Sequence, residues 1–375
     1  MMSKEIMSNL ENLYSDNLST ASQWQLMTRK FTKHRLAVWS GSLIIALYTC
    51  ALFCEFISPY SLDEQNIDYI YAPPQRLHWI GSDGIHFTPF VYGLKGIRHP
   101  TTLRKIYVED TTKIFPLQFF SRGSTYNFLG IFKTNIHLFN VEHGGTLFLL
   151  GTDSLGRDLF TRILYGARIS LTVGLIGVGL TFVFGLTIGV ISGYFGGWID
   201  NAIQRLIEIL RSFPSIPLWM ALSAALPSDW SPLKIYFGIT VVLSFLGWTG
   251  LARVVRGKIL SLREEDYATA AEVSGVSKKR IMTHHLLPGF TSHIVVSLTL
   301  ALPGMILGET SLSFLGLGLR SPITSWGVLL QEAQNVQAVA MQPWLLTPAV
   351  FVIIAVLAFN FVGDGLRDAA DPYDR

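Results

Sequence analysis

The stretch that decides the fold lies at residues 261–289 and reads SLREEDYATAAEVSGVSKKRIMTHHLLPG. It is the one long charged interruption between apolar segments that are each long enough to cross a bilayer. Ser261 and Glu264 have the spacing of a capping box, so we expect a helix to begin at about Leu262. Gly275 can take the left-handed conformation that ends such a helix.

A second short helix should follow the turn at Gly275. Ser277 can cap its start, and Pro288 with Gly289 should end it. The three basic residues at 278–280 would lie in its first turn, where the helix dipole disfavours cations. These charges therefore indicate either a contact outside the chain or an ordinary anchoring loop in the cytoplasm, and loop composition alone leaves both open.

The overall composition is that of a membrane protein. Half of the 375 residues are hydrophobic and 15% are charged, against roughly 25% charged residues in soluble domains. The net charge of +3 is small and gives no reason to expect nucleic acid as a partner. Cys50 and Cys54 lie one helical turn apart in an apolar segment, so we expect them to pack as small apolar side chains without a disulfide or a metal.

Apolar segments predict six membrane-spanning helices, so the expected fold class is an all-α polytopic membrane protein. The spans are expected at 36–58, 169–193, 199–226, 234–255, 291–319 and 343–362, with Pro214 and Pro217 kinking the third. Residues 1–35 form an N-terminal segment that ends in a basic cluster, and the loop at 256–290 is also rich in Lys and Arg. The positive-inside rule therefore places this loop and both termini in the cytoplasm.

A long segment at 59–150 separates the first two spans and should fold as an insertion. It is rich in Phe, Tyr, Thr and His and has β-like runs at 104–108 and 144–150, so we expect a small, mostly β domain on the extracytoplasmic side. Its histidines lack convincing ligand spacing, which favours surface or hydrogen-bonded roles over a metal site. They are His78, His86, His99, His137 and His143.

The sequence GTDSLGRD at 151–158 opens the rest of the chain, residues 151–375. Thr152 and Asp153 are good helix-starting residues, and an apolar stripe follows, so we expect an amphipathic helix at the outer interface before the second span. Glycines every four residues in and after that span predict close packing against a neighbouring helix. They are Gly185, Gly189, Gly193 and Gly197. On the third span, Asp200, Arg205 and Glu208 are spaced for mutual ion pairing.

Polar residues inside the fifth predicted span are candidates for a transport path. Glu309 lies in the run GETSLSFLG at 308–316. An unpaired carboxylate at that depth is costly, so Glu309 must face a partner or water. Glu309, Ser311 and Ser313 could therefore line a translocation path or its outer gate, and a structural hydrogen-bond network is the alternative.

Catalytic motifs are missing from the sequence. Gly257 and Lys258 form its one Gly-Lys pair, but Ala252 and Ile259 stand where a P-loop needs Gly and Ser or Thr. Neither His-Glu-x-x-His nor Gly-x-Ser-x-Gly occurs. We therefore assign no catalytic residue, no metal site and no cofactor to this chain.

The pattern within 261–289 resembles the EAA loop of binding-protein-dependent ABC importer permeases. That motif reads Glu-Ala-Ala, three residues, Gly, nine residues, then Ile-x-Leu-Pro, and five of its positions are kept in register. They are Ala270, Ala271, Gly275, Leu287 and Pro288. The chain departs from the motif with Thr269 in the place of Glu and His285 in the place of Ile. In the family this loop docks on a separate ATPase subunit, which implies that Tyr267 and Thr269 join the five kept residues in ATPase coupling.

A second segment resembles one particular group within this permease family. Residues 151–168 closely resemble the GTDxxGRDxxSRxxYGAR segment of dipeptide, oligopeptide and nickel permeases, C-type subunit, and the stretch at 78–83 is similar to its start. The residues of this interfacial motif are Gly151, Thr152, Asp153, Gly156, Arg157 and Asp158. The run at 308–316 and the tail at 363–372 also resemble the family, whereas the insertion is the least covered part.

Together these resemblances imply one half of the translocation path of a bacterial peptide-class ABC importer in the inner membrane, with alternating access as its mechanism. The implied partners are a homologous second permease, two ATPase subunits, an extracytoplasmic substrate-binding protein and a peptide. The alternatives are a permease for nickel or another small solute, a secondary transporter, and a membrane scaffold whose working part is the 59–150 domain.

Overall fold

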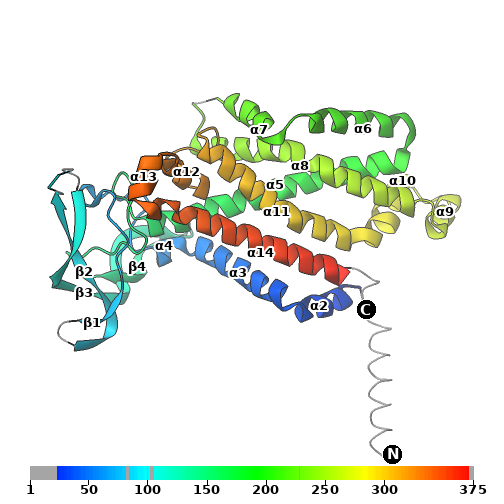
Figure 1. The fold of residues 1–375 in the computed structure, drawn as a ribbon. Helices are drawn as coiled ribbons and strands as arrows, with labels where there is room; N and C mark the ends of the chain where they lie inside the picture. The colour runs from blue at the N-terminus through cyan, green and yellow to red at the C-terminus, as the bar shows by residue number, and fades with distance from the viewer. Residues whose placement is uncertain are drawn as a thin grey trace, which may run out of the picture.

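The computed structural model describes residues 23–81, 84–98, 100–101, 105–142, 144–227 and 229–370. Long helices run side by side through the molecule, an antiparallel sheet lies at one end of them, and the short helices α9 (Asp266–Val273) and α10 (Lys278–Arg280) lie at the other (Figure 1). Some predictions fall outside the described residues. They concern 1–22, Ser82, Asp83, His99, Arg104, His143 and 371–375.

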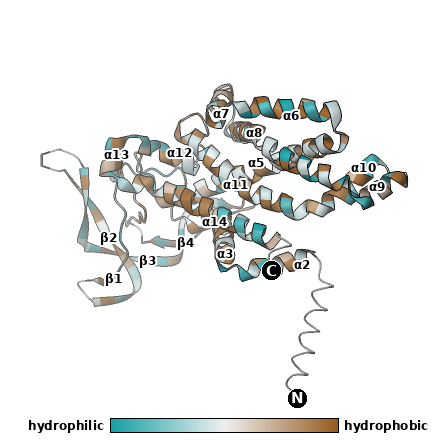
Figure 2. Cartoon of the chain, turned by 45° about the vertical axis from the view of Figure 1, so that its right-hand side comes forward, coloured by the Kyte–Doolittle hydropathy of each residue, from teal (hydrophilic) through white to brown (hydrophobic). Residues whose placement is uncertain are grey.

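Five of the described helical stretches are long and apolar enough to cross a membrane. Their main elements are α3 (Arg35–Leu52), α5 (Leu159–Phe195), α8 (Pro232–Leu262), α11 (Thr291–Phe314) and α14 (Thr347–Ala370). Hydrophobic residues dominate α14 (Figure 2), whose side chains include many Ala, Val, Ile and Phe. The chain is therefore a multi-pass membrane protein.

The predicted third span is divided into two shorter helices, α6 (Gly197–Ser212) and α7 (Ser215–Ala224). Proline disfavours the α conformation in the residue before it, and Phe213 is accordingly extended, with φ −84° and ψ 135°. The kink expected at Pro214 is thus a complete break. Hydrophilic and hydrophobic residues alternate along α6 (Figure 2), so this helix has one polar side.

The helix expected at the outer interface is the first part of α5 itself. Thr152 and Asp153 lie in a turn before it, and Asp158 is the residue that caps α5 by accepting a hydrogen bond from the Thr161 N–H at 2.8 Å. The prediction that 152 and 153 start a separate helix was therefore wrong. Asp158 has the side chain that reaches the free N–H groups of the first turn, and the earlier residues fold back onto other loops.

An antiparallel sheet lies between the first and second spans, as the sequence predicted. Its strands pair in chain order: β1 (His78–Gly81), β2 (Gly84–Arg98), β3 (Lys105–Phe128) and β4 (Phe132–Val141). The β-like run that begins at Lys105 lies in β3, but residues 144–150 form no strand. They run as a loop because their N–H groups bond to side chains: Leu147 donates to the Tyr60 hydroxyl and Phe148 to Gln75 Oε1.

Short elements complete the described chain. They are α2 (Gln23–Lys33), α4 (Cys54–Ile57), η1 (Ile67–Tyr69), η2 (Ile281–Leu286), η3 (Leu287–Phe290), α12 (Trp326–Gln331), η4 (Glu332–Gln334), α13 (Val336–Met341) and η5 (Pro343–Leu346). The loop with α12, η4 and α13 lies at the same end of the helices as the sheet (Figure 1). That end also holds the 151–158 motif, and α9 and α10 mark the opposite end.

The glycines of α5 let α8 approach closely, as predicted. A Cβ on Gly189 would lie 2.6 Å from the carbonyl oxygen of Ala252, and one on Gly193 would lie 2.8 Å from the Ile259 Cβ. Both distances are shorter than real side chains tolerate, so the spacing confirms a packing role for these two glycines. Gly197 is different, because a Cβ there would meet no atom within 4 Å.

Candidate functional site

The segment at 256–290 begins differently from the prediction. α8 continues to Leu262, so Ser261 lies in its last turn and does not cap the next helix. α9 starts after Glu265, which makes no side-chain capping bond. The capping-box prediction for Ser261 and Glu264 was therefore wrong. The reason is packing, since α8 keeps burying residues such as Ile259 up to its end.

The turn at Gly275 agrees with the prediction. Gly275 has a φ of +77°, its N–H donates to the Glu272 carbonyl at 3.0 Å, and the Val276 N–H donates to the Ala271 carbonyl at 3.1 Å. This pair of bonds is the Schellman motif that ends a helix on a left-handed residue. A side chain at 275 would meet no atom within 4 Å, so the backbone conformation alone favours glycine there.

The second predicted helix does not end at Pro288. It runs through a π-helical turn, η2, and a 3₁₀ turn, η3, into the fifth span, so that residues 278–314 are one helical stretch. The Leu287 N–H bonds to the Met282 carbonyl, five residues back. Proline cannot donate to an ordinary α-helical bond and clashes with the carbonyl four residues before it, and the widened turn removes that conflict.

The buried side of α9 consists of small side chains. Ala268 and Ala271 pack against Ile259 of α8 and Ile281 and Leu286 of η2. Its other side is free: Tyr267 is 44% exposed, Val273 is 85% exposed, and Thr269 and Ala270 are also exposed. Ala271 is therefore buried while Ala270 is exposed, because consecutive helical residues point in different directions. Of the other predicted coupling residues, Leu287 is half-buried and Pro288 is exposed.

Two arginines that the sequence reasoning missed hold this segment to the bundle. Arg263, just after α8, donates to the carbonyls of Gly193 at 3.2 Å and Tyr194 at 3.4 Å, which end α5. Arg256 donates both to Asp200 Oδ1 and to Asp200 Oδ2, each at 2.5 Å. These contacts couple the neighbouring ends of α5, α6 and α8 to the segment that carries α9.

Asp200 therefore does not pair with Arg205, contrary to the prediction. Arg205 instead pairs with Glu208 at 2.7 Å on the exposed side of α6. Asp200 is the buried member of the three, and its Oδ1 also accepts from the Ser192 hydroxyl at 2.5 Å. Helical spacing on α6 could not show this, because Arg256 lies on another helix.

Glu309 is fully buried on α11 and has three hydroxyl donors. Its carboxyl oxygens accept from Ser170 at 3.0 Å, Ser313 at 2.7 Å and Ser325 at 2.6 Å. Ser170 belongs to α5, and Ser325 caps α12, so one carboxyl group joins α5, α11 and the loop near the sheet. In this structure Glu309 and Ser313 form the hydrogen-bond network that was the alternative reading. Ser311 is half-buried and lies outside this described network.

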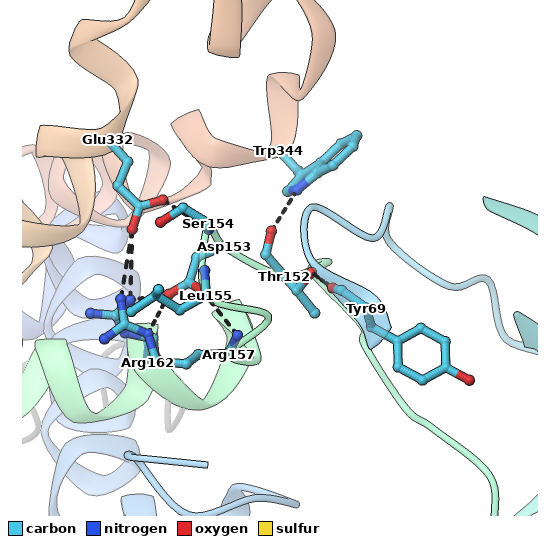
Figure 3. A network of polar contacts seen from close by, with 9 residues as sticks. All are labelled: Tyr69, Thr152, Asp153, Ser154, Leu155, Arg157, Arg162, Glu332 and Trp344. Atoms are coloured by element: carbon cyan, nitrogen blue, oxygen red, sulfur yellow. Dashed lines mark hydrogen bonds and ion pairs between the residues drawn. The ribbon is translucent and has the colours of Figure 1, made fainter. Parts of the chain in front are cut away.

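The interfacial motif at 151–158 is a closed turn (Figure 3). Thr152 accepts from the Ala72 N–H at 2.7 Å and donates to the Tyr69 carbonyl at 2.5 Å, and its own carbonyl accepts from the Trp344 indole at 3.1 Å. Gly156 packs directly on the backbone of Asn66, where a Cβ would clash. Gly151 forms the edge of the same turn beside Trp344. The motif thus joins the start of the insertion to the sixth predicted span.

Charged residues complete this turn. Asp153 accepts from the Arg157 side chain at 2.7 Å and from the Arg162 guanidinium. Glu332 of η4 lies 3.7 Å from Arg157 and accepts from the Ser154 N–H at 3.2 Å. Figure 3 shows that the two acidic residues approach the arginines from different elements. Glu332 was missed because it lies far along the chain from Asp153, and Arg162, although it lies within the segment at 151–168, was not singled out as a partner of Asp153.

Burial raises the pKa of two acidic groups here. The pKa of the Asp158 carboxyl is raised to about 7 by burial, and its Oδ1 has no partner among the described residues. Burial also raises the pKa of Glu332, and the negative charge of Asp153 raises it further. Both groups therefore hold a proton more readily than exposed carboxylates do.

Metal ligands do not gather within the described ranges. No group of three or more His, Cys, Asp or Glu side chains there could hold a metal ion. His137 is buried and lies with Nδ1 2.6 Å from the Ser58 carbonyl and Nε2 2.9 Å from the Ser124 carbonyl, so it joins the sheet to the end of the first span. Cys50 and Cys54 are both free thiols.

The described chain is thus a bundle of membrane helices with α9 at one end. Residues 185–373 match the family described as binding-protein-dependent transport system inner membrane component. Residues 22–74 match the N-terminal TM domain of oligopeptide transport permease C. The chain therefore belongs to this family of ABC importer permeases, which implies an ATPase and another permease subunit as partners.

Curated relatives agree with this family. The chain is 44% identical to the dipeptide transport system permease protein DppC of Alkalihalophilus pseudofirmus, over 59% of this chain and 71% of that protein. It is 42% identical to the oligopeptide transport system permease protein OppC of Haemophilus influenzae, over 60% and 70%. It is 40% identical to the glutathione transport system permease protein GsiD of Pectobacterium atrosepticum, over 94% and 92%.

Proposed function

We propose that this chain is the C-type permease subunit of an ATP-driven importer of dipeptides or short oligopeptides. The observation that carries the proposal is the agreement of the three relatives reported above, whose names refer to dipeptides, oligopeptides and glutathione. The match to the glutathione permease runs through nearly the whole chain, so it includes the insertion at 59–150. Nickel and other small solutes remain the competing substrates to test.

In the proposed topology the chain crosses the inner membrane six times. The pair α6 and α7 together makes the third crossing, with the break at Pro214 inside the membrane region. The insertion at 59–150 lies outside the cell membrane, and both termini and the loop at 256–290 lie in the cytoplasm. The support is the distribution of charge, because the basic residues at 278–280 lie at the end of the helices opposite the sheet (Figure 1).

For coupling, we propose that the exposed side of α9 docks on one of two ATPase subunits. Tyr267, Ala270 and Val273 lie three residues apart, so they share a face, and all are exposed. Thr269 lies beside this face, and the turn at Gly275 and the helix through Leu287 and Pro288 would transmit movement to α11. The contacts of Arg256 and Arg263 support this, because they make α9 and the inner bundle move together.

A homologous permease would supply the other half of the path, and an extracytoplasmic binding protein would deliver the peptide at the sheet end. We assign Glu309, Ser311 and Ser313 to the outer gate of this path. The support is the position of the Glu309 network, which joins α5, α11 and α12 at the end of the helices near the sheet. Opening outward would require these hydroxyl contacts to rearrange.

The test is purification of the tagged chain from its native membrane, followed by reconstitution in liposomes. We expect ATPase subunits and a second permease to co-purify, and labelled dialanine uptake to require ATP and the binding protein. Uptake of nickel but not of dialanine would contradict a peptide substrate and support a permease for nickel or another small solute. Uptake driven by an ion gradient in a preparation without any ATPase subunit would overturn the proposal.

A further inference from the structure

An apolar groove of about 540 Å³ lies between the end of the first span and the β3–β4 hairpin. Phe53, Phe56 and Ile57 form one wall, at α4 and the residue before it. The hairpin forms the other wall. Its lining residues are Tyr126, Phe128, Phe132, Thr134, Ile136 and Leu138. In Figure 1, β4 and α4 lie together at the end of α3, which agrees with this position.

Both walls of the groove are held in place by polar contacts behind them. Arg168 of α5 donates to the carbonyls of Ala51 and Leu52 and pairs with Glu55, which fixes the end of the span. On the other side, His137 lies 2.6 Å from the Ser58 carbonyl and Asn140 donates to the Pro59 carbonyl at 3.3 Å. The groove is therefore preformed and does not depend on a ligand for its shape.

The rim of the groove is apolar and open. At the hairpin tip Ile131 is 79% exposed and Phe132 is 56% exposed. Aromatic rings continue into the groove, where Phe128 stacks on Phe53 with centroids 5.8 Å apart. Exposing such rings to water is unfavourable, so something apolar is expected to cover them.

The groove is continuous with the lipid-facing surface of the first span. Leu52 is exposed on the last turn of α3, one residue before Phe53 of the groove, and Ile45 is exposed two turns earlier. A membrane helix of this kind ends at the level of the lipid headgroups, where aromatic side chains are favoured. Lys133, exposed beside the apolar tip, can reach the phosphates at that level. One wall of the groove therefore adjoins a surface of the first span that we expect to face lipid.

We propose that the β3–β4 hairpin lies in the membrane interface and that the groove holds an acyl chain of a phospholipid. The hairpin would then anchor the insertion on the bilayer beside the first span. In the proposed topology the hairpin lies on the outer leaflet, but its contact with lipid does not depend on that topology. A role in peptide transport is not assumed, so the proposal can fail or hold independently of the substrate.

The first test measures the depth of the hairpin in the bilayer. A nitroxide is attached at Ile131→Cys in the full complex in nanodiscs, with Cys50→Ala and Cys54→Ala as background, and uptake activity verifies the fold. We expect collisions with oxygen to exceed those with an aqueous nickel chelate. The matched label at Thr111→Cys, exposed in the other half of β3, should show the reverse. Greater access to the nickel chelate at 131 would overturn the proposal.

The second test identifies the occupant of the groove. Nanodiscs contain phosphatidylethanolamine with a photoreactive diazirine on one acyl chain, and the labelled peptides are mapped after irradiation. We expect labelling within 126–138, and loss of most of it in Leu138→Trp, which fills the groove, but not in Thr111→Trp. Absence of lipid label, or cross-links from 131 to the second permease or the binding protein instead, would overturn the proposal.

Discussion

At the scale of single residues, Asp158 combines two roles that conflict. Its Oδ2 caps α5 through the Thr161 N–H, which favours a charged or polar side chain, whereas its surroundings are fully buried. Burial prevails, because the pKa of Asp158 is raised to about 7. The negative Asp153 nearby acts in the same direction. The group therefore titrates in the physiological range, where its protonation affects stability.

The sign of this effect follows from proton binding. An unfolded aspartate has a pKa of about 4, so between about pH 4 and 7 the folded chain holds a proton that the unfolded chain has lost. Stability must then fall as pH rises through this window and level off above the folded pKa of Asp158, which is about 7. The loss at pH 8 is on the order of a few kcal/mol.

We therefore predict that Asp158→Asn stabilises the complex at pH 8. Asparagine keeps the cap of α5 but cannot ionise. The midpoint temperature of thermal inactivation is measured on the purified complex from pH 5.5 to 8. It should fall less steeply with rising pH in the variant than in the wild type. Other acidic groups with a raised pKa, such as Glu332, are present in both proteins. The difference between the two pH dependences therefore measures the contribution of Asp158.

Asp110→Asn on β3 is the matched control for this measurement. Asp110 is half-buried, and hydrogen bonds from the hydroxyl and N–H of Thr112 lower the pKa of its carboxyl. That group is ionised throughout the range, so its removal should leave the slope unchanged. If wild type and Asp158→Asn lose stability equally steeply, the buried Asp158 is not the titrating group.

At the scale of elements, the direction in which the chain leaves α9 is set by the turn at Gly275. Gly275 is left-handed with open space around it, so a larger side chain there meets no clash but strains the backbone. For L-residues this conformation costs roughly 1–2 kcal/mol, and more for a β-branched side chain. A change at 275 therefore alters the direction of α9 and of the helix that follows it.

Gly275→Val should uncouple transport from ATP hydrolysis. We expect uptake of labelled dipeptide to fall well below wild type at normal expression, while ATP hydrolysis by the complex continues. Gly275→Asn should retain uptake, because asparagine tolerates the left-handed conformation. Gly257→Ala, on α8 with equally open space, should also behave as wild type. Wild-type uptake in Gly275→Val would contradict the coupling role.

The same elements show what the sequence could reveal. The turn at Gly275 was predictable because a positive φ is a local property that glycine satisfies. The glycine spacing on α5 was likewise local. The effects of Pro214 and Pro288 were harder to predict. The helix is completely broken at Pro214, whereas the helical stretch continues through Pro288 by way of a π-helical turn. Which outcome occurs depends on the packing of neighbouring helices.

Partners from distant parts of the chain were beyond local patterns. Glu332 lies far along the chain from Arg157, and Arg256 far from Asp200, yet each pair forms one ionic contact. Sequence spacing on a single helix led instead to the wrong partner for Asp200. The network of Glu309 was foreseen as an alternative, but only the fold brings Ser170 and Ser325 to it.

At the scale of the whole molecule, the distribution of charge and the arrangement of the elements support the same orientation in the membrane. The sheet and the 151–158 motif lie at one end of the helices, and α9, α10 and the end of α14 lie towards the other (Figure 1). Basic residues at 278–280 belong to the second end. This distribution supports the proposed topology, in which that end lies in the cytoplasm. This orientation also brings α9 within reach of a cytoplasmic ATPase.

Single cysteines should report this orientation directly. In a background with Cys50→Ala and Cys54→Ala, a membrane-impermeant maleimide added to spheroplasts should label Thr112→Cys on β3. Ser274→Cys, exposed at the end of α9, should be labelled only after the membrane is permeabilised. Each variant must retain uptake, so that the labelled protein is the folded one. Labelling of both cysteines from the outside would contradict the proposed topology, because it would place α9 and the sheet on the same side and remove α9 from any cytoplasmic partner.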